Sequence, residues 1–433
     1  MTGRRIFYVQ SLHEAYGHTV LISPDEVSCS SLASFKTIHR ISKPFLKSHW
    51  YQKFAPPPNG IFNTIDPKDH AVRRKMFAHA FSKTALKTNW EIEIRRKVDM
   101  AIDKIKRDAL VGEVDILKFF MFMATDVVGH LCFGESFGTL EKERKTQYIE
   151  DLQRVSTISG LRAEFPTLFR IGKMSRLPFL ATPDDRLLEH ASIAVRNAKS
   201  QSDKTPNIFR KILAEEKSEG GVGSLSDMDI RQEAATLIVV GTDTTSNSLT
   251  FLVYNILKNP KLQKQLEDEV DTLADDFESK DVEGLPLLNA YIDEGLRLWG
   301  AAPGALPRDV PQGGAQLDGY FLPAATVVST QAYSIHRDPE IFPEPERFDP
   351  QRWLGPKSDE FKTANHPFGA GTRTCIGLHL ARMEMQLSLA LLFRQCKGLR
   401  IASSQTDEGM DIENFFLIGP KGHECVVTLK DGF

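Results

Sequence analysis

The sequence predicts an α+β fold that is mainly α-helical and forms a single domain over residues 1–433. Helix-forming stretches cover most of the chain, whereas strand-forming stretches are short, few and segregated from the helices. No linker divides the chain. Its content of 41% hydrophobic and 26% charged residues is typical of globular proteins and excludes disorder. The net charge of −3 argues against nucleic acid as the main partner.

The first half of the chain predicts one helix, two strands and then a mainly helical stretch. The helix spans residues 4–16, and the strands span residues 18–22 and 27–29. The helical stretch covers residues 69–213 and breaks near Pro166, Pro178 and Pro183.

The longest helix is expected directly after Ser226. This serine can cap a helix, with Asp229 three residues further on, and the next proline is Pro260. A helix of about 30 residues is roughly 45 Å long, at about 1.5 Å per residue. We expect it to pass through the core of the domain.

The last part of the chain predicts further helices over residues 261–273, 287–298 and 377–394. Strands are expected at residues 326–330 and in the tail at residues 424–429.

Cysteine use and hydropathy exclude several classes of protein. The five cysteines are scattered and form no C-x-x-C pair, which argues against a zinc cage or a disulfide framework and favours a reducing compartment. The longest apolar runs noted, residues 234–240 and 387–393, fall short of the roughly 18 residues of a membrane span. The chain is therefore expected to carry no transmembrane segment, while peripheral membrane contact stays possible.

The most informative segment is the loop before the last predicted helix. Gly369, Gly371 and Gly377 allow tight turns and close approach to a flat ligand. Cys375 precedes a helix N-terminus, where N–H groups and the helix dipole favour a thiolate, and Arg373 adds positive charge. Such a thiolate can ligate haem iron. A buried structural cysteine on a glycine turn is the alternative.

This loop resembles the haem-thiolate loop of the cytochrome P-450 monooxygenases. It matches the pattern F-x-x-G-x-R-x-C-x-G at its five fixed positions, Phe368, Gly371, Arg373, Cys375 and Gly377. The resemblance implies a cytochrome P-450 fold with small β-sheets and a haem b whose iron is bound by Cys375. It also implies that Phe368 shields the sulfur and that Arg373 pairs with a haem propionate.

The long helix carries a second motif from Val240 to Thr245. A glycine inside a helix costs about 1 kcal/mol, so Gly241 requires a reason, and we expect it to leave space for a small ligand. Thr244 can donate to the carbonyl of Val240 and bend the helix. A plain polar helix face is the alternative. The resemblance implies an oxygen-binding groove in which Asp243 and Thr244 deliver protons, and Val240 replaces the usual alanine or glycine.

Glu294 and Arg297 are spaced i,i+3 on a predicted helix. A solvated ion pair is the default interpretation. The resemblance implies instead a buried E-x-x-R pair that needs a third group, because buried charges are costly unless they are fully partnered. Arg347 lies in a literal P-E-R-F sequence, but the distance to the cysteine loop favours Arg352, with Gln351 in the place of the usual acid.

Three further residues are expected at the haem propionates by the same resemblance. His70 and Arg74 are spaced i,i+4 on a basic helix, and His70 replaces the usual tryptophan. Arg308 follows Leu306 and Pro307. For an isolated arginine, a place on the surface is the alternative.

The motifs occur in family order over residues 4–430 and imply a monooxygenase that inserts one oxygen atom of dioxygen into a lipophilic substrate. No flavin or dinucleotide segment is present, so electrons are expected from NADPH through a separate NADPH–cytochrome P-450 reductase. A basic patch for this partner, or else an ordinary solvated face, comprises Arg73, Arg74, Lys75, Lys83 and Lys87.

The resemblance is strongest to filamentous-fungal microsomal members, which implies secondary metabolism at the cytosolic face of the endoplasmic reticulum. We expect this sequence to lack the N-terminal anchor of those members, and a truncated sequence, a late gene start and a form without an anchor would all account for it. Expected substrate contacts are Val240 and residues 302–306 and 415–418.

Two other functions remain open at this point. One is a dioxygen-independent haem-thiolate isomerase or dehydratase, a class that tends to lose the groove threonine and that a Thr244→Ala variant with undiminished turnover would indicate. The other is a non-catalytic haem-binding protein, which has no need of Asp243 and Thr244.

Overall fold

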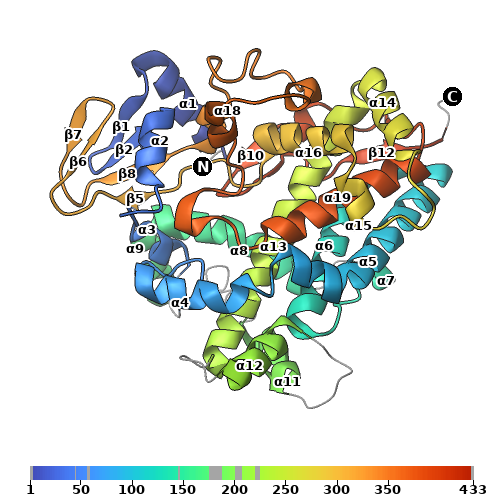
Figure 1. The fold of residues 1–433 in the computed structure, drawn as a ribbon, viewed down its shortest axis with the longest axis horizontal. Coiled ribbons are helices and arrows are strands. Elements are labelled where there is room, and N and C mark those ends of the chain that lie inside the picture. The colour runs from blue at the N-terminus through green and yellow to red at the C-terminus, as the bar shows by residue number, and fades with distance from the viewer. Residues whose placement is uncertain are drawn as a thin grey trace.

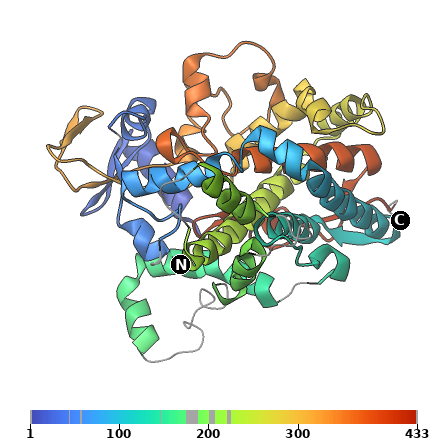
Figure 2. The same cartoon turned by 60° about the horizontal axis from the view of Figure 1, so that its bottom comes forward.

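Helix α13, Asp227–Leu257, runs through the middle of the molecule (Figure 1). Its first turn carries the predicted cap, because the Ser226 hydroxyl accepts from the Asp229 N–H and the Asp229 carboxylate accepts from the Ser226 N–H. The helix packs along α6, Ile116–Phe133, and also contacts α16, Pro286–Trp299, and α19, Leu378–Gln395. It remains surrounded by other helices when the molecule is turned (Figure 2).

The expectation that the chain contains no apolar stretch long enough for a membrane span is corrected by helix α6. It has 18 residues with a mean hydropathy of 1.6, so by length and composition it could cross a membrane. However, 89% of this stretch is buried inside the protein, where it packs against α13 and against α5, Lys83–Val111. Its apolar character is accounted for by its place in the core.

The structure, a computed structural model, describes residues 3–43, 45–55, 59–144, 147–174, 188–199, 207–219 and 225–430. Helices dominate the described residues, as predicted, and the breaks expected near Pro178 and Pro183 lie outside them. The other α-helices are α1 Arg5–Tyr16, α2 Leu32–Ile38, α3 Trp50–Phe54, α4 Pro67–Ala78, α5 Lys83–Val111, α7 Thr139–Lys142, α8 Gln147–Glu164, α9 Pro166–Met174, α11 Ser192–Lys199, α12 Ile208–Glu219, α14 Pro260–Val270, α15 Ser279–Glu283, α16 Pro286–Trp299, α17 Ala332–Ile335, α18 Asp359–Ala364 and α19 Leu378–Gln395. Short 3₁₀ turns lie at Pro350–Trp353, Gly371–Arg373 and Glu408–Met410.

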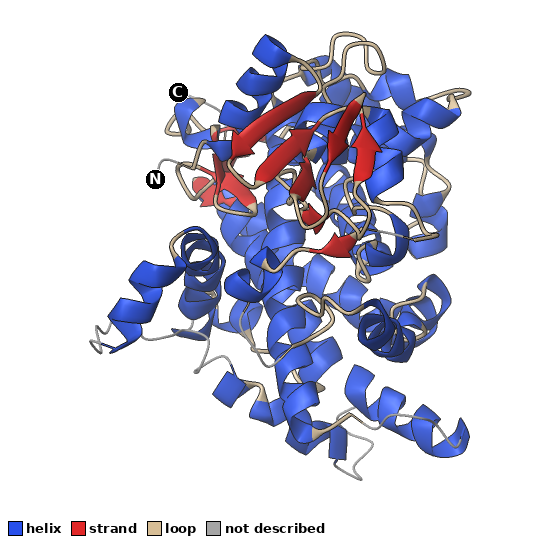
Figure 3. Cartoon of the chain, turned by 90° about the vertical axis from the view of Figure 1, so that its left-hand side faces the viewer, coloured by secondary structure: helices blue, strands red, loops and turns tan. Residues whose placement is uncertain are grey.

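The strands of the largest sheet lie at one end of the molecule, which faces the viewer in Figure 3, whereas β12, Val426–Thr428, lies toward the other end in Figure 1. The largest sheet has the order β1-β2-β8-β5-β3, in which β2 and β8 are parallel and the other neighbours antiparallel. Its strands are β1 Thr19–Ser23, β2 Glu26–Cys29, β3 Leu46–Lys47, β5 Arg308–Asp309 and β8 Val327–Thr330. The register of β3 on β5 places Lys47 opposite Arg308.

Three smaller sheets complete the fold. They are β4 Glu113–Asp115 with β12 Val426–Thr428 and β9 Arg400–Ile401, the hairpin β6 Ala315–Leu317 with β7 Tyr320–Leu322, and the hairpin β10 Ile412–Asn414 with β11 Ile418–Pro420. The sequence did not predict β3 to β7 or β9 to β11, because strands of two or three residues are too short to show a hydropathy period.

Candidate active site

A cavity of about 280 Å³, here called the haem cavity, lies between α13, α4, the loop before α19 and the edge of the β3–β5 pair. The predicted residues that line it are Val240, Thr244, Cys375, Phe368, Gly377, Arg373, His70, Arg74 and Arg308. Segments that are far apart in the sequence therefore meet around one space. Of the expected substrate contacts, Ala302, Leu306, Phe416 and Leu417 also line it.

Cys375 lies at the cavity wall, with its side chain exposed to the cavity space although the residue is deep inside the protein. Its N–H donates to the Phe368 carbonyl at 2.9 Å, which closes the loop. Burial raises the pKa of the Cys375 thiol, while the Gly377 N–H and the Arg74 guanidinium lower it. The N–H group at the helix terminus therefore favours the thiolate, as predicted, but desolvation outweighs this effect in the protein alone, and a bound cation would offset the desolvation.

Gly371 is required by close packing. It has a positive φ of 66°, and a Cβ atom here would lie 2.1 Å from the His39 carbonyl oxygen at the end of α2. The loop that carries Cys375 is thus held against α2 by a residue without a side chain.

The groove motif on α13 borders the haem cavity, which Val240, Gly241 and Thr244 line. The Thr244 hydroxyl donates to the Val240 carbonyl at 2.6 Å, as predicted. Gly241 lines the haem cavity, as does Val128 of α6, and a Cβ on Gly241 would lie 2.5 Å from Cγ2 of that valine. The glycine therefore permits close contact of α13 with α6 beside the cavity. Asp243 is buried on the same turn but is not among the described residues that line the cavity.

Five basic side chains surround one end of the haem cavity: Lys47, His70, Arg74, Arg308 and Arg373. Lys47, His70 and Arg308 are buried. Lys47 had not been identified from the sequence, because no local motif marks it. It reaches the cavity through the pairing of β3 with β5, which sets it beside Arg308.

The hydrogen bonds of this cationic cluster go to neutral groups. Arg373 donates to the carbonyls of Thr64 and Ile65 at 2.7 and 2.9 Å. Arg74 donates to the Thr374 carbonyl at 2.7 Å, and Arg308 donates to the Tyr51 hydroxyl at 3.2 Å. Burial and the neighbouring cations lower the pKa of His70 to about 3, so this imidazole is neutral at physiological pH.

The cluster fits the two carboxylates of a haem. The one acid among the described residues that line the cavity is Glu384 of α19, and its buried carboxyl forms no ion pair with these cations. Buried cations without counter-ions are costly unless a ligand supplies the negative charge. A flat dianionic ligand with its metal at the Cys375 sulfur satisfies both the cationic cluster and the thiol.

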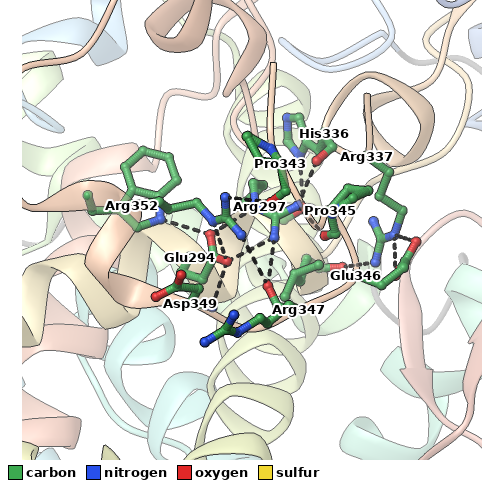
Figure 4. A network of polar contacts seen from close by, with 12 residues as sticks. Glu294, Arg297, His336, Arg337, Pro343, Pro345, Glu346, Arg347, Asp349 and Arg352 are labelled. Carbon is green, nitrogen blue, oxygen red and sulfur yellow. Dashed lines mark hydrogen bonds and ion pairs between the residues drawn. The ribbon is translucent and has the colours of Figure 1, made fainter. Parts of the chain in front are cut away.

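Glu294 and Arg297 form the buried network that the resemblance implied (Figure 4). Arg297 makes two bonds of 2.8 Å to the Glu294 carboxylate and donates to the carbonyls of His336 and Pro345 at 2.7 Å. Arg352 supplies the third charge, with Nε 2.9 Å from Glu294 Oε1. These hydrogen bonds offset the desolvation of all three charges.

The choice of Arg352 over Arg347 is confirmed. The Arg347 side chain is exposed and pairs with Glu344 at 2.9 Å, while its carbonyl accepts from Arg297. Gln351, in the place of the usual acid, is exposed and takes no part in the network. The Trp353 indole N–H donates to Glu294 Oε2 at 2.8 Å, a member that the sequence had not indicated.

The predicted basic patch is smaller than expected. Arg73 is turned inward, with bonds of 2.6 Å to Asp229 and 3.0 Å to Glu233. Arg74 points to the haem cavity. Lys83 is exposed and pairs with Glu283 at 2.8 Å.

Comparison with known proteins agrees with this geometry. Residues 4–426 match the family model described as cytochrome P-450. The chain is 41% identical to cytochrome P-450 monooxygenase tazI of Aspergillus terreus, over 99% of this chain and 89% of that protein. It is 38% identical to cytochrome P-450 monooxygenase stcB of Emericella nidulans, over 98% and 84%, and to cypX of Dothistroma septosporum, over 99% and 86%.

The family match spans nearly the whole chain, and these relatives share the monooxygenase name. The chain therefore belongs to the cytochrome P-450 family of haem-thiolate enzymes and is a monooxygenase of that family, which draws its electrons from a redox partner.

Proposed function

We propose that the protein inserts one oxygen atom of dioxygen into a lipophilic substrate, by hydroxylation or epoxidation, in fungal secondary metabolism. The observation that carries the proposal is the position of the Cys375 side chain at the wall of the haem cavity. The α13 groove and a cluster of cations without counter-ions line the same cavity. The apolar residues Val240, Leu306, Phe416 and Leu417 on the cavity wall favour a lipophilic substrate.

Cys375 would hold haem b by its thiolate, while Lys47, Arg74, Arg308 and Arg373 would hold the propionates. When bound, the haem supplies the oxidising chemistry, in which one atom of dioxygen enters the substrate and the other leaves as water, with two electrons and two protons consumed. The haem iron would supply the positive charge that stabilises the Cys375 thiolate.

Thr244 and Asp243 would move the protons. The Thr244 hydroxyl donates its one proton to Val240, so in this arrangement its oxygen can only accept. Delivery of a proton into the cavity requires the hydroxyl to turn away from the Val240 carbonyl and to receive a replacement proton. The buried Asp243 carboxyl on the adjacent position is the acid proposed to supply it.

The proposed electron donor is an NADPH–cytochrome P-450 reductase at the cytosolic face of the endoplasmic reticulum. Exposed Lys75, Lys83 and half-buried Lys87 would face this partner, and slower reduction of a Lys83→Glu, Lys87→Glu variant at low salt tests the contact. Phe165, Leu168 and Ile171 on and before α9 are 46%, 60% and 59% exposed, which supports peripheral contact with the membrane. Co-sedimentation with vesicles of microsomal lipid tests that contact.

The carbon monoxide spectrum of the reduced protein tests the central assignment. We expect the red-shifted Soret band of a thiolate-bound haem, and its loss in Cys375→Ser. Cys132→Ser is the matched control, since Cys132 is a second thiol that lines the same cavity. A globin-like band in the wild type, or an unchanged band in Cys375→Ser, would refute the proposal. Turnover that needs neither reductase nor dioxygen would identify an isomerase or dehydratase instead.

A further inference from the structure

A short segment between α3 and α4, residues 60–65, forms part of the wall of the haem cavity. This segment, here called the strap, places Ile61 and Phe62 at the cavity. Its own backbone makes one turn, in which the Thr64 N–H donates to the Gly60 carbonyl at 3.1 Å. The strap is neither helix nor strand, so its position depends on contacts with other parts of the chain.

Three strap carbonyls accept hydrogen bonds from two members of the cationic cluster. Lys47 donates to the Phe62 carbonyl at 2.5 Å. Arg373 donates to the carbonyls of Thr64 and Ile65 at 2.7 and 2.9 Å. Hydrogen bonds from charged donors are stronger than those between neutral groups. The position of the strap is therefore tied to the positions of these two cations.

Lys47 also contacts the side chain of Phe62. Its Nζ lies 4.5 Å from the centroid of the Phe62 ring and 3.9 Å from that of the Tyr51 ring. A cation at this distance from an aromatic ring is attracted to it. Displacement of Lys47 would therefore release both the carbonyl and the ring of a residue at the cavity wall.

Neither cation spends all its donors on the strap. A lysine ammonium group has three N–H donors and an arginine guanidinium has five. Lys47 gives one of them to the strap and Arg373 gives two. Both residues line the haem cavity. A carboxylate in the cavity can accept from the remaining donors while the strap stays bound, so each cation is able to bridge a haem propionate and the strap.

The cations repel one another when no carboxylate lies between them. Lys47 is buried and lies opposite Arg308 in the β3–β5 pair. Burial and the positive charges of Arg308 and Arg373 lower the pKa of Lys47. Water around these cations would relieve the repulsion, but it can enter only if the strap leaves them. Two propionates remove the repulsion and with it the reason for the strap to open.

The start of the strap is held by a different group. The Glu233 carboxylate of α13 accepts from the Ile61 N–H at 2.8 Å. A Cβ atom on Gly60 would lie 3.1 Å from Glu233 Oε2, so the backbone packs closely on this acid. Opening of the strap is therefore expected in residues 62–65, with Ile61 as the fixed end.

We propose that the two carboxylates of the haem close the strap, because they hold Lys47 and Arg373 in place and these cations hold residues 62–65 at the cavity wall. The inference rests on the proposed function, since it requires a haem at the cationic cluster. It goes beyond that function by making the wall of the cavity depend on the charge of the cofactor's side chains, and not only on the presence of its ring and iron.

Hydrogen–deuterium exchange of the strap tests the proposal in the loaded protein. The protein would be loaded with haem b or with its dimethyl ester, which has the same ring and iron but no carboxylate charge. We expect the strap amides to exchange at least tenfold faster in the ester form. Exchange in the hairpin 315–322, which does not line the cavity, should be equal in both forms.

The carbon monoxide band separates this proposal from the proposed function. Equal strap exchange in two forms that both give the thiolate band would overturn the closure by the carboxylates and leave the function intact. Absence of the thiolate band in the haem b form would contradict the function.

Variants of Lys47 test the same link without the ester. In the haem b form, Lys47→Met is expected to speed strap exchange at least fivefold while the thiolate band remains. Lys47→Arg, which keeps the charge, should stay within twofold of the wild type. Lys68→Met is the matched control, because Lys68 is an exposed lysine just beyond the strap. Unchanged strap exchange in Lys47→Met would overturn the proposal, whatever the ester form shows.

Discussion

Two buried charged clusters in this molecule are built in opposite ways. In the first, Glu294 lies between Arg297 and Arg352, and backbone carbonyls accept from both guanidinium groups. In the second, Lys47, Arg74, Arg308 and Arg373 meet at the haem cavity with no acid paired to them among the described residues. The first cluster is complete within the chain, while the second lacks its negative charge.

This difference distinguishes a network that stabilises the fold from a cluster that binds a ligand. A buried network with all its hydrogen bonds made holds α16 to the segment 336–353 and needs nothing further. A buried group of cations bonded only to neutral oxygens destabilises the protein until an anion binds. Removal of a member should therefore have opposite effects on stability in the two clusters.

The largest effect is expected at the complete cluster. Glu294→Gln leaves two buried guanidinium groups without their counter-ion, and we expect it to lower the free energy of unfolding by about 3–5 kcal/mol. Chemical denaturation measures this loss. Glu344→Gln is the control, because Glu344 is exposed and its pair with Arg347 should contribute less than about 0.5 kcal/mol. Equal losses in the two variants would contradict the distinction.

The buried Glu233 carboxyl combines features of both clusters, because only part of its hydrogen-bonding capacity is used. Its Oε1 accepts from the Ile61 N–H at 2.8 Å and from Arg73 at 3.0 Å, but its buried Oε2 has no partner in the described structure. Burial raises the pKa of Glu233 to about 7, despite the opposing effect of Arg73. The folded protein therefore keeps a proton that the unfolded chain releases near pH 4.5.

Stability should consequently fall as the pH rises from about 4.5 to about 7. The loss attributable to Glu233 is about 3 kcal/mol, because each pH unit between the pKa values of the unfolded and folded chains contributes about 1.4 kcal/mol. Urea denaturation across this range, compared with Glu233→Gln, measures it. The variant should show a shallower decline, and parallel curves would mean that Glu233 is not protonated in the folded state near neutral pH.

Smaller effects are expected at the cationic cluster, where a substitution should raise the stability of the haem-free protein but weaken haem binding. Burial, Arg308 and Arg373 lower the pKa of Lys47, which shows how unfavourable its charge is here. Lys47→Met should stabilise the haem-free protein by about 1–3 kcal/mol and weaken haem binding by a similar amount, through loss of a charged hydrogen bond.

Thermal unfolding without haem and haem titration measure these two quantities. Lys83→Met, which removes an exposed cation paired with Glu283, should change neither. A loss of stability in haem-free Lys47→Met would show that the charges of the cluster are compensated within the protein.

Local sequence was sufficient for the parts of the fold and site that depend on neighbours along the chain. The capping box at Ser226, the Thr244 bond to Val240 and the Glu294–Arg297 pair all join residues three or four positions apart. The cysteine loop was found for the same reason, since its fixed residues lie within ten positions of one another. Even Arg352 could be selected, because its distance along the chain to that loop is informative.

Tertiary structure decided everything that depends on contacts between distant segments. Lys47 enters the site because β3 pairs with a strand 261 positions later in the chain, and the reason for Gly241 is a valine on another helix. The strap is held by Lys47 and Arg373, which lie on either side of it in the chain. A short-range hydrogen bond is encoded in the spacing of two residues, whereas packing and desolvation depend on which surfaces meet after the chain has folded.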